Sequence, residues 1–147
     1  MNVAELDELP MYFCCENLDD RDWRGAVLRG AVFEGVSMCD TRLAHADLSG
    51  AEFYLCMGAG EVFRNATLCD ARFLGGRFEG VSFAGADLRN AAFCKDELDN
   101  YVILCGADFT DALLDGAVFD GAVYNAATRF PPGFEPELRG FVRMSLL

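Results

Sequence analysis

Large apolar residues recur in this chain with a period of five, which fits neither a helix nor a strand. Steps of five from Phe83 land on Phe78 and Phe73 in one direction, and on Leu88 and Phe93 in the other. A helix has an apolar period near 3.6 residues, and a half-buried strand has a period of 2. The pattern therefore predicts a chain that turns a corner every five residues and points one large side chain inward on each side.

The other positions of the repeat have a fixed character too. The residue two before each centre is mostly Ala, and the residue two after it is mostly Gly, Asn or Asp. A small residue suits a second inward position where no room is left, and Gly, Asn and Asp tolerate the tight or left-handed backbone of a corner. Four sides then close a square coil of about 20 residues, and coils stack at the strand spacing of roughly 4.8 Å.

Several segments match the repeat A-(D/N)-L-x-x closely, namely "ADLSG" (46–50), "NATLCDARF" (65–73), "ADLRN" (86–90) and "ADFTD" (107–111). On these motifs the chain resembles the pentapeptide-repeat family over roughly Leu18 to Tyr124. The resemblance implies an all-β fold: a right-handed quadrilateral β-helix (a solenoid) of about 5–6 coils with short caps at both ends.

Sorting the centres by coil predicts four columns. Side one takes Leu18, Met38, Gly58, Phe78, Leu98 and Phe119. Side two takes Trp23, Leu43, Phe63, Phe83, Leu104 and Tyr124. Side three takes Leu28, Leu48, Leu68, Leu88 and Phe109, and side four takes Phe33, Phe53, Phe73, Phe93 and Leu114. This assignment interprets the slip of the pattern at 99–103 as one extra residue in a bulge beside Tyr101.

The two ends depart from the repeat. We expect residues 1–13 to form an N-terminal cap, residues 14–127 the β-helix and residues 128–147 a C-terminal cap or tail. The segment "TRFPPGFEP" (128–136) resembles the T-x-F-P-x-G-F-x-P tail of cyanobacterial pentapeptide-repeat proteins, with Phe130 and Phe134 as cap residues. The last apolar residues find no place in the predicted core, so a disordered tail, a tail folded back along one side, a dimer contact and a partner contact all remain open for them.

Composition narrows the range of partners. The net charge of −12 opposes binding to nucleic acid and to membrane surfaces, and it favours a basic protein surface. No apolar run is long enough to span a membrane, and the acidic N-terminus lacks the basic start of a secretory signal, so we expect a cytoplasmic protein. The seven cysteines show no C-x-x-C spacing and are expected to be free thiols, with Cys14 and Cys15 adjacent.

The sequence predicts no catalytic residue, no metal ligand and no cofactor. A filled column offers no cleft in which titratable groups could converge. The single histidine, His45, falls at a corner position where a polar residue is expected. Arg21 and Glu61 take inward positions on side two, where either local distortion or pairing would accommodate them.

Binding of a protein partner is the favoured class of function. A first candidate surface is the outward apolar set assigned to side four, with Arg72 and Lys95 at its margin: Tyr54, Leu55, Leu74, Cys94 and Leu113. A second is an arginine stripe on side two: Arg24, Arg42 and Arg64. A third is the tail: Phe141, Met144, Leu146 and Leu147.

Two functions follow from these observations. The first is a non-enzymatic scaffold or adaptor that binds protein through a flat side and its tail, as a component of a larger photosynthetic or regulatory assembly. A homodimer through one end or through the C-terminal tail is a further expectation. The alternative, implied by the family resemblance, is an acidic DNA mimic that regulates a topoisomerase and protects gyrase. Gyrase protection and the dimer state would separate them.

Overall fold

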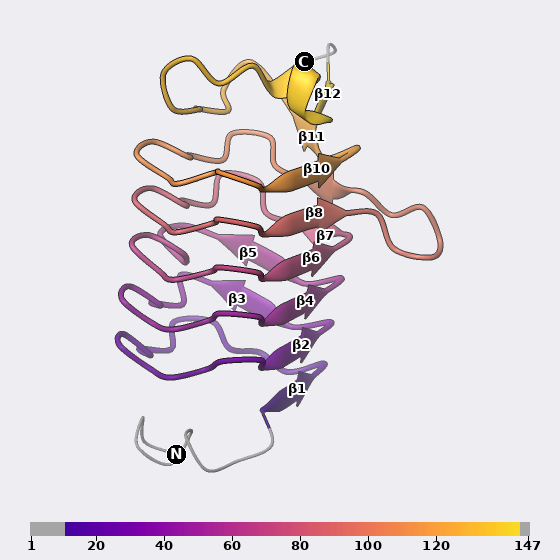
Figure 1. The fold of residues 1–147 in the computed structure, drawn as a ribbon. Helices are drawn as coiled ribbons and strands as arrows, with labels where there is room; N and C mark the ends of the chain where they lie inside the picture. The colour runs from indigo at the N-terminus through magenta and orange to yellow at the C-terminus, as the bar shows by residue number, and fades with distance from the viewer. Residues whose placement is uncertain (1–10, 145–147) are drawn as a thin grey trace.

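A computed structural model describes residues 11–144 of the chain as a stack of four-sided coils (Figure 1). Two of the four faces are parallel sheets of six strands each. The first sheet contains β1 (Tyr12–Cys14), β2 (Val32–Glu34), β4 (Glu52–Tyr54), β6 (Arg72–Leu74), β8 (Ala92–Cys94) and β10 (Val118–Asp120). The second sheet contains β3 (Ser37–Cys39), β5 (Met57–Ala59), β7 (Gly76–Arg77), β9 (Val102–Ile103), β11 (Val123–Tyr124) and β12 (Val142–Arg143).

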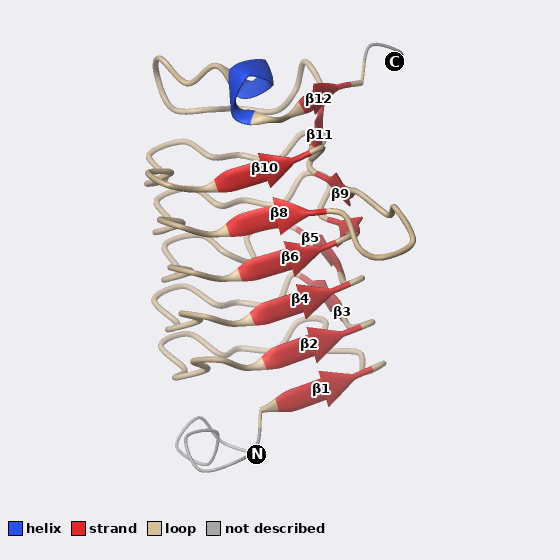
Figure 2. Cartoon of the chain, turned by 45° about the vertical axis from the view of Figure 1, so that its right-hand side comes forward, coloured by secondary structure: helices blue, strands red, loops and turns tan. Residues whose placement is uncertain are grey.

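The other two faces pair through single parallel bridges, such as Val27 to Asp47 and Asp47 to Thr67. The only helix among the described residues is a 3-10 turn, Pro136–Arg139, near the C-terminal end of the stack (Figure 2). No helix within residues 11–144 is long and apolar enough to cross a membrane. The predicted all-β quadrilateral solenoid is confirmed, but it has about 7 turns in place of the predicted 5–6 coils.

The core consists of like residues stacked in columns, as the period predicts. The phenylalanine column runs through the first sheet, and successive rings stack with centroids 4.5–5.1 Å apart: Phe13, Phe33, Phe53, Phe73, Phe93 and Phe119. A neighbouring column consists only of leucines, all buried: Leu28, Leu48, Leu68, Leu88 and Leu114. The corner residues have positive φ and are largely Gly, Asp and Asn, which confirms the predicted chemistry of the turns.

The predicted columns are wrong beyond residue 94, because the insertion there contains six residues rather than one. Phe93 and Phe119 are adjacent in their column although 26 positions separate them, against 20 between Phe73 and Phe93. Leu98, predicted as a centre, is 81% exposed in the loop that projects between β8 and β9 (Figures 1 and 2).

The true register moves each later centre by one side. Leu104 lies next to Phe78, Phe109 stacks on Phe83, Leu114 follows Leu88, Phe119 stacks on Phe93, and Tyr124 lies in the second sheet. The unmixed leucine and phenylalanine columns follow from this corrected register.

Local distortion of the coil accommodates the two irregular residues that were expected to point inward on side two. Arg21 and Glu61 are both exposed, and Val62 is fully buried beside Phe63 in place of Glu61. Thr41, at the equivalent position one coil away, is buried and donates its hydroxyl hydrogen bond to the Leu18 carbonyl oxygen at 2.8 Å.

Aromatic rings cover the C-terminal end of the stack. Phe130 stacks on Phe109 with centroids 5.8 Å apart, and Phe134 stacks on Phe130 at 5.1 Å. The guanidinium of Arg139 donates to the carbonyl oxygens of Leu114 and Ala117, at 3.2 and 3.1 Å. At the other end, the proposed cap lies mostly outside the described residues, and Phe13 is already part of the phenylalanine column.

Candidate functional site

The six inserted residues, 95–100, and Tyr101 after them form the 95–101 loop, which has a defined internal structure. The Asp96 carboxylate accepts hydrogen bonds from the backbone N–H of Leu98 and of Asn100, both at 2.9 Å, and from the Asn100 side chain at 2.8 Å. The bonds from Asn100 are the main reason that the pKa of Asp96 lies below its usual value. Lys95 forms an ion pair with Asp99 at 2.9 Å, so the loop is held as a turn.

Two glycines let this loop lie close against the coils. A Cβ on Gly75 would approach the backbone oxygen of Asn100 at 3.0 Å, and a Cβ on Gly121 would collide with the ring of Tyr101. Both glycines also have positive φ, as their corners require. The loop is therefore seated on the solenoid, and Tyr101 marks the contact.

A groove of about 670 Å³ lies between this loop and the outer face of the second sheet. The outward side chains of Met57, Arg77, Ile103 and Val123 follow one another in register along that sheet. Three more apolar side chains complete the lining: Tyr101 from the loop, Leu55 from a corner, and Met144 directly after β12.

The charged groups of the groove are paired within the protein. Arg77 donates to Glu79 through both Nε and Nη2, at 2.8 and 2.5 Å, and Asp99 is bound to Lys95. The Lys95 ammonium also lies 5.9 Å from the centroid of the Tyr101 ring. The exposed apolar atoms of Met57, Tyr101 and Met144 are therefore the part of the groove surface that remains available for contact with a partner.

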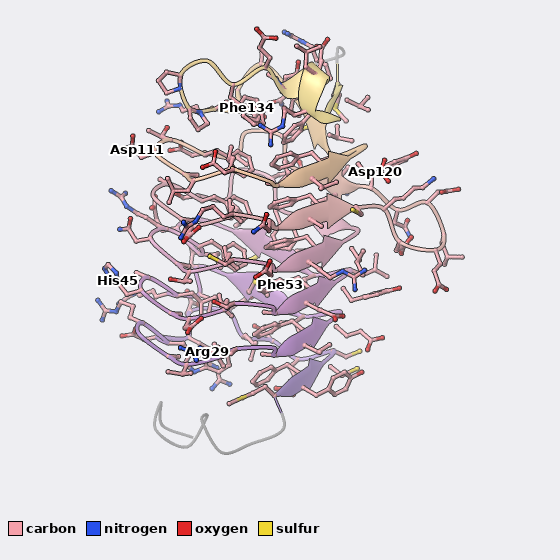
Figure 3. All side chains as sticks on the ribbon, in the orientation of Figure 1. Arg29, His45, Phe53, Asp111, Asp120 and Phe134 are labelled. Atoms are coloured by element: carbon pink, nitrogen blue, oxygen red, sulfur yellow. The ribbon has the colours of Figure 1, made fainter. Side chains whose placement is uncertain are left out.

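The predicted side-four surface is brought together only in part. Tyr54, Leu74 and Cys94 are consecutive outward residues on the first sheet, and Asp120 follows them on the side of the inserted loop (Figure 3). Leu55 occupies the next corner and lines the groove instead. Leu113 was misplaced by the register error, because it pairs with Asp87 on a different face.

The arginine stripe carries less free charge than its sequence suggests. Arg24 forms an ion pair with Asp22 at 2.7 Å, and Arg64 forms one with Glu61 at 3.3 Å. Asp22 has its pKa lowered to about 2, chiefly by the hydrogen bond from Arg24 and further by the charge of Arg42. These cations therefore mainly offset local acids.

The tail residues have different fates. Phe141 is buried, with its ring 4.4 Å from that of Phe119, so its prediction as a partner contact is wrong because it completes the core. Met144 is exposed and lines the groove. Leu146 and Leu147 lie outside the described residues.

The sequence pattern alone does not indicate this site, because the slip of the repeat predicts a one-residue bulge in place of a loop. Met57, Tyr101, Ile103 and Val123 were not predicted as site residues. One signal in the sequence points to them. An insertion of six residues keeps leucine stacked on leucine and phenylalanine on phenylalanine in the last coil, whereas an insertion of one residue does not.

The single histidine, His45, does not line the groove. His45 is exposed at a corner with φ of +61° and points away from the core (Figure 3). The described residues contain no group of three or more His, Cys, Asp or Glu side chains arranged to hold a metal ion.

The four-sided coils and the stacked columns define a β-solenoid built from five-residue repeats. A family model of pentapeptide repeats matches eight copies, over residues 22–56 and 62–95. The comparison confirms the pentapeptide-repeat family for these residues of the chain.

The chain is similar to several solved structures. A pentapeptide-repeat protein, alr5209, from Nostoc PCC 7120 is 19% identical, with coverage of 93% of this chain and 100% of its own and a TM-score of 0.33. Rfr23 from Cyanothece 51142 is 20% identical, with coverage of 83% and 65% and a TM-score of 0.32. Full-length QnrB1, described as a plasmid-mediated fluoroquinolone resistance protein, is 15% identical, with coverage of 91% and 92% and a TM-score of 0.33. No curated protein matches the sequence.

Proposed function

We propose that this protein is a non-enzymatic binding module that holds a segment of another protein in the groove between the 95–101 loop and the second sheet. The observation that carries the proposal is the groove itself, about 670 Å³ in volume and placed where an insertion breaks an otherwise regular solenoid. Ligand sites are commonly concave, mostly apolar and already formed in the free protein.

The lining suits a protein segment. Two methionines, a tyrosine and Leu55 supply its exposed apolar surface, and methionine and tyrosine are enriched in protein interfaces. The unbranched thioethers of Met57 and Met144 can adapt to an incoming side chain, while the sheet beneath them is rigid. The groove has room for a few side chains, so the expected anchor is one or two apolar residues.

Charge indicates what flanks that anchor. Arg77, which lines the groove, and Lys95 of the adjoining loop are already paired with carboxylates, and the whole chain carries a charge of −12. An acidic surface speeds the approach of basic partners and rejects acidic ones. We therefore expect an extended segment with an aliphatic or aromatic anchor and neighbouring Lys or Arg residues. The setting we infer is cytoplasmic, as an adaptor within a larger assembly of the kind suggested by the cyanobacterial-type tail.

A random peptide library selected on the immobilised full chain tests this proposal. Selected peptides should share an apolar anchor with basic flanks, and Met57→Asp or Tyr101→Ser should weaken their binding about 10-fold or more. Leu113→Asp, an exposed leucine on another face, is the matched control and should leave affinity unchanged. Leu74→Asp tests the first-sheet surface in the same assay.

Two results would reject the groove. One is that no peptide family is selected. The other is that selected peptides lose affinity with Leu74→Asp or Leu113→Asp but not with Met57→Asp, which would move the site to the corresponding face.

The alternative, an acidic mimic of DNA that acts on a topoisomerase, has one supporting observation, the net charge of −12. Three aspartates, however, are bound to arginines of the chain itself: Asp22 to Arg24, Asp47 to Arg29 and Asp87 to Arg89. This pairing leaves a less regular array of free acids than a phosphate backbone presents. Protection of gyrase from a quinolone in a supercoiling assay would favour the alternative over the groove.

A further inference from the structure

Two adjacent thiols in the first coil are positioned to act as one ligand. Cys14 and Cys15 are both exposed, and their sulfur atoms lie 3.3 Å apart. Neighbouring side chains in a strand point to opposite faces, so adjacent cysteines seldom meet there. Cys14 is the last residue of β1, and Cys15 is the following corner residue with φ of +56°, which directs both side chains outward.

The backbone that carries the pair is fixed by the solenoid. Phe13, directly before the pair, stacks on Phe33 at 5.0 Å, and the Cys15 N–H donates to the Glu34 carbonyl oxygen at 2.8 Å. The next coil has Gly35 at this corner, where a Cβ would make only an ordinary contact with the Cys15 sulfur, at 3.6 Å. The corner is thus clear on the side of the next coil, and the two thiols are pre-organised.

The distance between the two sulfur atoms can be compared with the distances that different bridging atoms require. Two bonds of about 2.3 Å, the length of a zinc–thiolate bond, separate their sulfurs by roughly 3.8 Å if they meet at a tetrahedral angle. The same bonds separate them by about 3.3 Å if they meet near a right angle, as at a pyramidal trivalent centre. The observed 3.3 Å matches the pyramidal case.

We propose that Cys14 and Cys15 form a dithiol site for a monosubstituted trivalent arsenical. An organoarsenic oxide would exchange its oxide for the two sulfurs: two As–S bonds form, the As–O bonds break, and the two thiol protons leave with the oxide as water. Arsenic remains trivalent, so no oxidant or reductant is needed. The other five cysteines are half-buried or buried, and Cys39 and Cys69 are half-buried single thiols.

Titration of the reduced full chain with phenylarsine oxide tests the site. We expect one equivalent to bind, to protect two thiols from a disulfide reagent and to be released by a dithiol but not by a monothiol. Cys14→Ser and Cys15→Asn should each weaken binding roughly 100-fold, because each leaves a single sulfur. Asparagine is chosen at position 15 because it occupies other positive-φ corners of this fold, Asn65 and Asn90.

Cys39→Ser and Cys69→Ser are the matched controls and should bind as the wild type does. The fluorescence of the only tryptophan, Trp23, whose ring lies 5.4 Å from that of Phe13, reports whether each variant retains the first coil. The proposal is overturned if folded Cys14→Ser binds with unchanged affinity, or if the wild type binds no arsenical. Neither result depends on the partner proposed for the groove.

Discussion

Truncation of Phe73 is the sharpest test of how this solenoid is stabilised. Its ring is fully buried and stacks on Phe53 and on Phe93, with centroids 4.5 Å away on each side. A buried Phe→Ala change costs about 3–5 kcal/mol, and each aromatic pair contributes about 0.5–1.5 kcal/mol beyond the area it buries. Because Phe73→Ala removes two stacked pairs at once, we expect a loss near the upper end, about 4–5 kcal/mol.

Two variants separate stacking from simple burial. Phe73→Leu keeps most of the volume and loses the stacking, so it should cost about 1.5 kcal/mol. Phe134→Ala removes a partly buried ring at the end of the stack and should cost less than about 2 kcal/mol. The predicted order of destabilisation is therefore Phe73→Ala well above the two controls.

Urea unfolding, followed by far-UV circular dichroism and by the fluorescence of Trp23, measures these differences. Circular dichroism reports the whole stack, whereas Trp23 reports the first coil. In a solenoid each coil touches only its neighbours, so a mid-stack cavity could separate the two transitions. The reasoning is refuted if Phe73→Ala costs no more than Phe134→Ala, since the column would then not be the main source of stability.

Three further predictions follow from single residues. Leu98→Asp should leave the urea midpoint unchanged, because Leu98 is exposed in the inserted loop. A large decrease in the midpoint would indicate that Leu98 is a core residue. Gly76→Ala should cost more than Gly25→Ala in the same measurement: both have positive φ, but only at Gly76 would a Cβ meet backbone, 2.6 Å from the Cys56 oxygen. Stability should fall as the pH drops from about 4 to 2, because the hydrogen bond from Arg89 lowers the pKa of Asp87 from 3.8 to about 2, and this contribution is complete only above the unfolded value. Arg89→Met should flatten that part of the pH profile, and an unchanged profile would contradict the assignment.

The fold was predictable because each repeat position has its own physical requirement. A column admits only a residue that fits between copies of itself, which is why phenylalanine follows phenylalanine and leucine follows leucine. Corners demand positive φ, which limits them mostly to Gly, Asn and Asp. Such local requirements can be recognised from the sequence before any tertiary contact is known.

The insertion could not be sized in the same way. Six inserted residues are one full repeat plus one residue, so Leu98 still falls on the five-residue step and the pattern appears to slip by only one. Nothing local distinguishes Leu98 from a core leucine. Its exposure is decided by Phe119, 21 positions later, which stacks on Phe93 and leaves residues 95–100 outside the coil.

The same reasoning explains why the groove lies where it does. A regular four-sided coil has flat faces and a filled interior, so it presents little concave surface to a ligand. A groove needs a departure from the period, and the departure must be held rigidly to be useful for recognition. The 95–101 loop meets both conditions, because it leaves the repeat after Cys94 and is fixed by the bonds to Asp96 and by Tyr101 against Gly121. In this protein the repeat supplies the rigid base, and the interruption of the repeat supplies the proposed site.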